Sequence, residues 1–125
     1  CEEKELYKFS AAEATALKKD IDLDRAIENL KKEHIVDPKS TLQTIEWARP
    51  KTTAECADGY KGRMGIHEVL EITSTIRELI MKNATADEIH QQALREDMLS
   101  MLLEGFIRVA QHVTSVEEIL RVTRE

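Results

Sequence analysis

The sequence is poor in aromatic residues and in cysteine, and each shortage excludes a class of protein. Aromatic residues make up only 4 % of its 125 residues, so we expect a core of aliphatic side chains, which suits small packed helices. Two cysteines, Cys1 and Cys56, are too few for a disulfide-rich secreted scaffold, and free thiols in a reducing cytoplasm are the default interpretation. A chain of this length corresponds to about one domain.

The sequence also lacks a surplus of positive charge and any long apolar run. With 18 Lys and Arg against 24 Asp and Glu, the net charge of −6 argues against nucleic acid as a main partner, because phosphate binding needs basic surfaces. No apolar run approaches the roughly 20 residues that span a bilayer, so we expect no direct membrane insertion. The chain begins with Cys1 rather than Met and shows no signal peptide, and we expect it to be a fragment of a longer protein.

Glycine is scarce, and most of it is concentrated in one place. Three of the four glycines, Gly59, Gly62 and Gly65, lie in the stretch GYKGRMGIHEVLEIT over residues 59–73. Clustered glycines mark tight turns or backbone with positive φ. The apolar residues that follow them predict a short strand at about residues 63–71. The stretch is therefore interpreted as a glycine-rich turn that leads into a strand.

Capping patterns predict helices on both sides of this stretch. Ser10 with Glu13 and Thr85 with Glu88 fit capping boxes, in which side chain and backbone exchange hydrogen bonds. The predicted helices cover about residues 11–19, 23–34, 86–95 and 96–111. One more helix is predicted to start after Ser74 or Thr75 and to end just before Asn83, and a last one to start after Thr114 or Ser115. Within the helix at 96–111, Gly105 is expected to allow a close helix–helix contact.

These elements predict a mainly α fold with a short β element, in which a small helical bundle follows a cysteine-loop subdomain. We place the subdomain, with two helices, at residues 1–58 and the strand with the helical bundle at residues 59–125. Within the subdomain, Ile45 and Trp47 are predicted to share one face of a short strand that stops at Pro50. Residues 51–58 are predicted to form a loop.

The glycine-rich turn does not have the pattern of a phosphate-binding loop. A Walker A loop needs GxxxxGK[ST], in which loop amides and the lysine surround the phosphates and a hydroxyl holds Mg²⁺. Here Lys61 lies between Gly59 and Gly65, and no Ser or Thr follows Gly65. A structural turn, with Lys61 and Arg63 facing solvent or an adjacent domain, is the favoured interpretation.

A zinc site is only partly supported by the residue types present. Structural zinc usually takes two close pairs of cysteine or histidine ligands. Cys1 and Cys56 each stand alone, and the four histidines form no HxxxH pair. Zinc ligation by Cys1 and Cys56 would therefore be incomplete, and two ordinary thiols are the alternative.

Acid–base catalysis has less support than either binding site. His67 stands alone in the predicted strand, and Glu68 and Glu71 have Arg63 and Arg77 near them as ion-pair partners. A structural salt bridge explains these carboxylates without chemistry. We predict no catalytic residue in this chain.

Residues 59–72, GYKGRMGIHEVLEI, resemble a segment in the C-terminal domain of the secretion ATPases, the family that powers type II secretion and type IV pilus assembly. In that family a GYxGRxGIxEVL-like run follows a cysteine-rich loop. The similarity continues in order through residues 76–80, 86–89 and 98–99, and it ends with TSVEEILRVT at residues 114–123. Residues 1–55 match less well, because Cys1 and Cys56 stand near the places of two zinc-binding CxxC pairs that are both incomplete here.

The resemblance implies a C-terminal accessory domain of a hexameric motor ATPase at the inner face of the cytoplasmic membrane. The parent protein would bind ATP and Mg²⁺ through Walker motifs that these 125 residues lack, so this chain alone would be inactive. The implied partners are the ATPase core of the same chain, neighbouring subunits of a homohexamer and a membrane platform protein. The motif residues implied at interdomain contacts are Gly59, Tyr60, Lys61, Gly62, Arg63, Gly65 and Glu68.

Two alternatives from other classes stay open. The chain could be a free-standing interaction module without ATPase activity, or a metal-dependent regulatory module. The motor interpretation predicts a P-loop encoded upstream of Cys1, whereas the interaction module predicts a start codon close to Cys1. We also hypothesise that helix packing and Trp47 replace zinc as the element that holds the first subdomain together.

Overall fold

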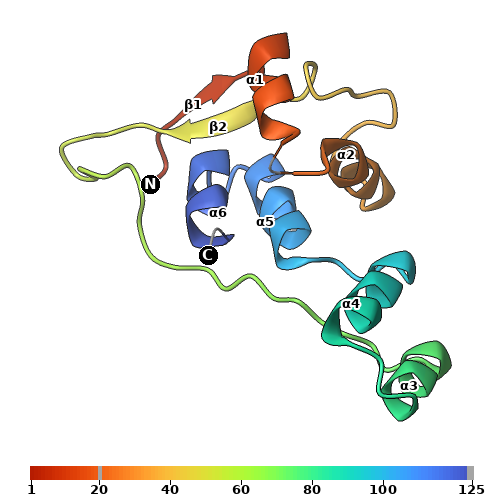
Figure 1. Cartoon of the computed structure of the whole chain (residues 1–125). Coiled ribbons are helices and arrows are strands. Elements are labelled where there is room, and N and C mark those ends of the chain that lie inside the picture. Colours follow the sequence, from red (N-terminus) through yellow and green to blue (C-terminus); the bar gives the residue numbers. More distant parts are fainter. Residues whose placement is uncertain (20, 124–125) are drawn as a thin grey trace.

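The computed structural model describes residues 1–19 and 21–123, which form six helices and one two-stranded sheet (Figure 1). The elements in order are β1 (Lys4–Tyr7), α1 (Ala11–Leu17), α2 (Leu23–Lys32), β2 (Trp47–Pro50), α3 (Ser74–Met81), α4 (Ala86–Arg95), α5 (Met101–Ala110) and α6 (Val116–Thr123). The predicted fold class, mainly α with a short β element, is confirmed. The division at residue 58 stays a prediction.

The β element lies elsewhere than predicted. β1 pairs with β2 in an antiparallel register that sets Tyr7 opposite Trp47 and Lys4 opposite Pro50. The strand end at Pro50 is confirmed, while β1 was not predicted. The strand predicted at about residues 63–71 is wrong for this chain, because that stretch is extended but pairs with no strand among the described residues.

Each helix begins at a side chain that accepts a hydrogen bond from the first turn. The capping boxes of Ser10 with Glu13 and of Thr85 with Glu88 are both formed, and Asp22 and Ser100 cap α2 and α5. The cap of α3 is Thr73 rather than Ser74 or Thr75, since the Thr73 hydroxyl accepts the Ile76 amide at 3.2 Å. Of the two caps predicted for α6, the hydroxyl of Ser115 is the one that accepts the Glu118 amide, at 3.2 Å.

Four helices end at a residue with left-handed backbone and no glycine. His34, Asn83, Asp97 and His112 have φ between 54° and 66°, and each is followed by a residue whose amide reaches back to the last turn of the helix. The prediction for Asn83 is confirmed. Asp97 corrects the predicted helix at 96–111: it turns the chain after α4, and α5 starts only at Met101 because Ser100 caps it.

One main core joins both ends of the chain. Trp47 is fully buried, and its ring lies 5.4 Å from that of Phe9 and 5.2 Å from that of Phe106. Its indole N–H donates to the Leu42 carbonyl at 3.4 Å. Aliphatic residues of α2, α5 and α6 pack around these rings. Three of the five aromatic residues therefore form the centre of a core that is otherwise aliphatic.

Helices α3 and α4 form an arm at some distance from this core (Figure 1). They pack on each other around Ile76 and Ala93, which are buried but do not belong to the main core. Lys32 of α2 reaches the carboxylate of Asp97 at 3.0 Å, and the Arg25 guanidinium donates to the Leu94 carbonyl. Polar contacts thus join the arm to α2.

The close contact predicted at Gly105 is confirmed, and it leads to a stability prediction. A Cβ atom at Gly105 would lie 2.8 Å from Cγ2 of Ile119, where α5 meets α6. Overpacking of about 1–3 kcal/mol opposes a gain of about 1 kcal/mol in helix propensity, so we expect Gly105→Ala to lower the free energy of unfolding. Urea denaturation followed by circular dichroism measures the change.

The matched background for this test is Ile119→Ala, which removes the atoms that the new methyl group meets. In that background Gly105→Ala should stabilise the protein, because only the propensity gain remains. An equal loss of stability in both backgrounds would contradict the proposed contact.

Candidate functional site

The glycine-rich motif lies on a long extended segment that crosses one side of the molecule. Residues 60–73, here called the crossing segment, leave the loop after β2, run past α6 and α5, and end at the arm (Figure 1). It carries all the motif residues predicted for interdomain contacts except Gly59, which immediately precedes it. The structure therefore gathers that set of predicted residues along one line.

Two of the three glycines of the motif have a backbone conformation that favours glycine. Gly59 has φ +71°, and a Cβ atom there would lie 2.6 Å from Cβ of Pro50 at the end of β2. Gly62 has φ +75° with open space around it. Gly65 does not have positive φ, but a Cβ atom there would lie 2.9 Å from the His67 ring. The first two confirm the predicted turn, and they direct the chain away from the sheet.

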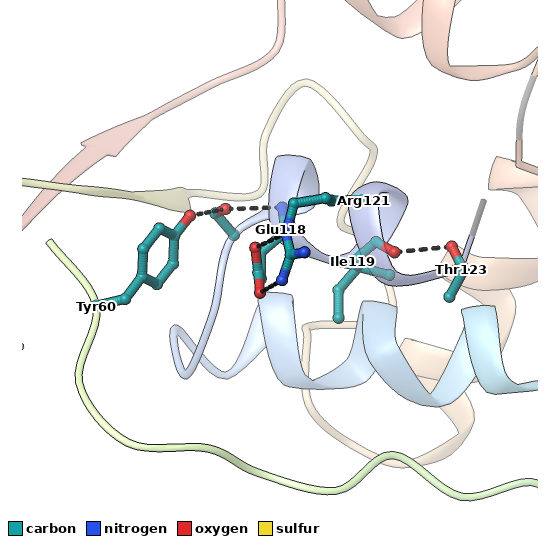
Figure 2. Close-up of polar contacts among 6 residues, drawn as sticks. Tyr60, Glu118, Ile119, Arg121 and Thr123 are labelled. Atoms are coloured by element: carbon teal, nitrogen blue, oxygen red, sulfur yellow. Dashed lines mark hydrogen bonds and ion pairs between the residues drawn. The ribbon is translucent and has the colours of Figure 1, made fainter. Parts of the chain in front are cut away.

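The start of the crossing segment is fixed to the C-terminal helix. The hydroxyl of Tyr60 shares a hydrogen bond of 2.5 Å with that of Ser115, and the Ser115 side chain also caps α6 (Figure 2). Glu118 and Arg121 form a two-bond ion pair beside it, at 2.7 and 2.8 Å. The hydrogen bond from Arg121 lowers the pKa of Glu118 below its ordinary value. The tyrosine of the motif thus acts as a structural anchor.

The middle and the end of the crossing segment are fixed to α4. The Thr73 hydroxyl donates to the carboxylate of Glu96 at 2.7 Å, and Gln92 donates to the same carboxylate at 3.0 Å. These two hydrogen bonds, with that from Gln92 the larger cause, lower the pKa of Glu96. Glu68 lies 3.6 Å from Nδ1 of His90, so its partner is a histidine rather than the predicted Arg63 or Arg77.

The two basic residues of the motif point away from the rest of the described chain. Lys61 and Arg63 are exposed, and neither forms an ion pair with the described residues. Arg63 borders a hollow of about 420 Å³ between the crossing segment and α6, whose apolar lining includes Met64 and Ile119. A second hollow of about 400 Å³ lies further along, against α4 and the start of α5. The segment therefore spans the helices without packing tightly on them.

The two cysteines are brought together, but not as a metal site. Cys1 and Cys56 form a disulfide that joins the start of the chain to the loop after β2, which corrects the interpretation of two free thiols. No group of three or more His, Cys, Asp or Glu in the described part of the chain could hold a metal ion. Because tetrahedral zinc needs four ligands and both sulfurs are bonded to each other, the residues present do not fit zinc.

The motif residues of the crossing segment were identified from the sequence, but the residues that hold the segment in place were not. Ser115 was identified only as a helix cap, and nothing in the sequence links it to Tyr60, 55 residues away. Glu96 was placed at the start of a predicted helix and not opposite Thr73. These pairs depend on how α4 and α6 fold back on the segment, so no local pattern could indicate them.

The anchor at Tyr60 leads to a prediction with a matched control. Tyr60→Phe should lower the free energy of unfolding by about 1 kcal/mol, the usual net contribution of one hydrogen bond. In contrast, the buried hydroxyl of Tyr7 has no hydrogen-bond partner among the described residues, so Tyr7→Phe should leave stability unchanged or raise it. Urea denaturation of both variants measures the difference, and equal effects would contradict the Tyr60 anchor.

Stability should fall in acid because several glutamates form hydrogen bonds in the folded state. Glu13, Glu88, Glu96 and Glu118 all have a pKa lowered from the ordinary value of 4.5. A lowered folded-state pKa means that the unfolded state binds protons first, so stability is complete above about pH 4.5 and is lost as the pH falls through the lowered values. Urea midpoints at pH 7, 4.5 and 3 measure this loss, which Glu96→Gln should reduce. A midpoint that stays constant down to pH 3 would contradict the prediction.

Comparison with known proteins gives a match over most of the chain. The family model described as "Type II/IV secretion system protein" matches residues 14–121, which is most of the chain. None of the helices in the described ranges is long and apolar enough to cross a membrane.

Individual relatives are much longer proteins. The type IV pilus assembly ATPase PilB of Pseudomonas aeruginosa is 34 % identical over 88 residues, covering 70 % of this chain and 16 % of the relative. PilB of Acinetobacter baylyi is 44 % identical over 71 residues, covering 57 % and 12 %. The type II secretion system ATPase E of Vibrio cholerae is 39 % identical over 67 residues, covering 54 % and 13 %. The chain thus spans about a sixth or less of the length of these relatives.

Proposed function

Because the chain belongs to the type II/IV secretion system protein family, we propose that it is the C-terminal accessory domain of a hexameric motor ATPase that powers type IV pilus assembly or type II protein secretion. ATP and Mg²⁺ bind to the remaining length of the parent protein, and this domain couples hydrolysis there to assembly. The observation that carries the proposal is the family match over residues 14–121 together with relatives that are named as ATPases of both systems.

The charge and surface of the domain support a role in contacts rather than in chemistry. The glycine-rich turn holds no phosphate-binding loop, and Lys61 and Arg63 extend from it into solvent. We assign the motif residues Gly59 to Glu68 to the contact with the ATPase core of the same chain. Neighbouring subunits of the homohexamer and the membrane platform protein are the further partners, at the cytoplasmic face of the membrane.

We also propose that the domain has two parts. Residues 1–58 form a divergent cysteine-loop subdomain that the disulfide and the packing of Trp47 hold together, in place of the zinc that the family resemblance implies. Residues 59–125 form the part that faces the ATPase core. The main core contains residues of both parts, so we expect α5 and α6 to move as one body with the first part.

The experiment that tests the motor role begins with the coding region upstream of Cys1. We expect a GxxxxGK[ST] loop after a strand within about one or two domain lengths, and magnesium-dependent ATP hydrolysis by the purified parent protein. A start codon close to Cys1 would overturn the proposal and would leave a free-standing interaction module. The matched control for hydrolysis is the parent with the P-loop lysine replaced by alanine. This variant should not hydrolyse ATP, while its circular dichroism spectrum should equal that of the unaltered parent.

A further inference from the structure

The disulfide closes the base of the first subdomain. Cys1 lies just before β1 and Cys56 lies in the loop after β2, and the two are 55 residues apart in the sequence. Because β1 and β2 are antiparallel, with Lys4 opposite Pro50, the start of β1 and the end of β2 lie side by side (Figure 1). The chain therefore enters and leaves this subdomain at one neck, which a single covalent bond closes.

Apart from this bond, little holds the loop after β2 to the sheet. Residues 51–58 of that loop form one ion pair with the rest of the described chain, between Lys51 and Glu3 at 3.2 Å, and its side chains are 60 and 63 % exposed. Exposed ion pairs contribute little to stability. The backbone hydrogen bonds of the loop are local, and two of them join Thr53 and Cys56. The disulfide is therefore the main restraint on the loop.

The disulfide also lies where the glycine-rich motif begins. The Gly59 amide donates to the Cys56 carbonyl at 3.1 Å, so the first residue of the motif is bonded to the cysteine itself. Tyr60 follows and is hydrogen-bonded to Ser115 of α6. The cysteine bond thus fixes the point from which the motif leaves the first subdomain.

The same site accommodates both redox states of the pair. Cys1 and Cys56 are each half-buried, so small molecules in solution reach both sulfurs. Sγ of Cys56 lies 3.3 Å from the Tyr60 carbonyl oxygen, which is in place to accept a hydrogen bond from the thiol once the disulfide is reduced. Partly exposed disulfides are the ones that thiols reduce most readily.

We propose that Cys1 and Cys56 are a redox-controlled clasp: oxidation closes the neck of the first subdomain and holds the start of the motif in place, whereas reduction releases it. The chemical partner is a low-molecular-weight thiol–disulfide couple of the glutathione type. What the clasp controls is the contact of residues 59–68 with the ATPase core, and this part of the proposal rests on the proposed function.

Opening of the clasp is a thiol–disulfide exchange. The thiolate of one small thiol attacks a sulfur of the pair and forms a mixed disulfide, while the other sulfur leaves as a thiolate and takes up a proton. A second small thiol then attacks the mixed disulfide, releases the remaining cysteine and leaves joined to the first as the small-molecule disulfide. The cysteine pair gains the two electrons and two protons that the small thiols lose, and closing is the reverse reaction.

We expect the closed clasp to raise the rate of ATP hydrolysis by the parent protein. Residues 59–68 follow Cys56 directly, so a released loop must be ordered again whenever the motif makes its contact. Ordering one mobile side chain changes an equilibrium by about two- to tenfold. The oxidised parent should therefore hydrolyse ATP faster than the reduced parent by about this two- to tenfold factor.

Trapping of free thiols tests the clasp itself. The parent protein is equilibrated at several ratios of reduced to oxidised glutathione, its free thiols are alkylated, and mass spectrometry of its peptides gives the fraction of Cys1 and Cys56 that is bonded. We expect this fraction to pass from mostly bonded to mostly free and to return when the ratio is reversed. A pair that stays bonded, or stays free, at every ratio overturns the proposal.

Hydrogen exchange in the same samples tests the restraint on the loop. The hydrogen-bonded amides of Thr53, Cys56 and Gly59 should exchange at least about tenfold faster after reduction, whereas amides of α5 should not change. The matched control is Lys51→Met, which removes the ion pair but keeps the disulfide, and it should not speed exchange in the oxidised parent. Equal exchange in the oxidised and reduced parent overturns the proposal, and so does a Lys51→Met variant that is as open as the reduced parent.

The double variant Cys1→Ser/Cys56→Ser separates this result from the fate of the motor proposal. Its rate of ATP hydrolysis should equal that of the reduced parent at every glutathione ratio. A redox-dependent rate that persists in the double variant, or an active ATPase whose rate ignores the state of the pair, would keep the motor role and overturn control by the clasp. A parent without ATPase activity would overturn the motor role, and the clasp would then stand or fall with thiol trapping and hydrogen exchange.

Discussion

Replacing Trp47 by alanine is expected to lower the free energy of unfolding by about 3–5 kcal/mol, the usual cost of removing a buried tryptophan. The indole is fully buried between the rings of Phe9 and Phe106, and it also donates to the Leu42 carbonyl. The cavity that the substitution creates would lie between β2 and α5, so the loss of stability includes the contacts between these two elements. Such a loss is comparable to the whole stability of a small domain, and the variant should be largely unfolded at 37 °C.

Unfolding of this variant has to be followed by circular dichroism, because Trp47 is the only tryptophan and its removal leaves no tryptophan fluorescence to measure. Trp47→Phe should recover part of the stability by keeping an aromatic ring at the centre of the core. The control is Leu6→Ala in the paired strand, where the side chain is 52 % exposed and the cost should be small. A loss for Trp47→Ala no larger than that for Leu6→Ala would contradict the central role of the tryptophan.

Reduction of the disulfide is the second large effect that we expect. Cys1 and Cys56 are 55 residues apart, and closing a loop of that length restricts the unfolded chain by about 4 kcal/mol in the chain-entropy model. Dithiothreitol should therefore lower the melting temperature of the oxidised protein. In a compartment that keeps thiols reduced, the two sulfurs remain neighbouring thiols, so this stabilisation belongs to the oxidised form.

A chelator provides the decisive control for the cysteine pair. EDTA should leave the melting temperature unchanged, because the described residues contain no cluster that could hold a metal ion. The variant Cys1→Ser/Cys56→Ser should melt like the reduced protein and should not respond to dithiothreitol. A large loss of stability on chelation would show that the two sulfurs bind metal, and it would contradict the disulfide.

The helices could be predicted from the sequence because their signals are local. Ser10 with Glu13 and Thr85 with Glu88 are three residues apart, and a capping box needs nothing beyond that spacing. The end of α4 at residue 95 was predicted correctly, but the start of α5 was placed too early, at residue 96, because Asp97 turns the chain where no glycine marks the turn. Local chemistry was therefore sufficient wherever the residue type matched the backbone conformation.

The sheet and the anchors of the crossing segment could not be predicted because they depend on distant pairs. Lys4 and Pro50 are partners in the sheet, and Tyr60 and Ser115 are partners in the anchor. Nothing near Lys4 indicates a strand until β2 is placed beside it. The strand predicted at about residues 63–71 was wrong, because an apolar pattern indicates only that a face needs cover and does not show that a partner strand is present.

The separate small core of the arm gives the molecule two cooperative units of unequal strength. Ile76 and Ala93 lie outside the main core, and the arm is joined to α2 through the polar contacts of Lys32 and Arg25. Units with few shared apolar contacts open at different free energies, so α3 and α4 should unfold before the body that contains Trp47. Tryptophan fluorescence would report only the body. The crossing segment, fixed to α6 at one end and to α4 at the other, links the two units and would transmit tension between them.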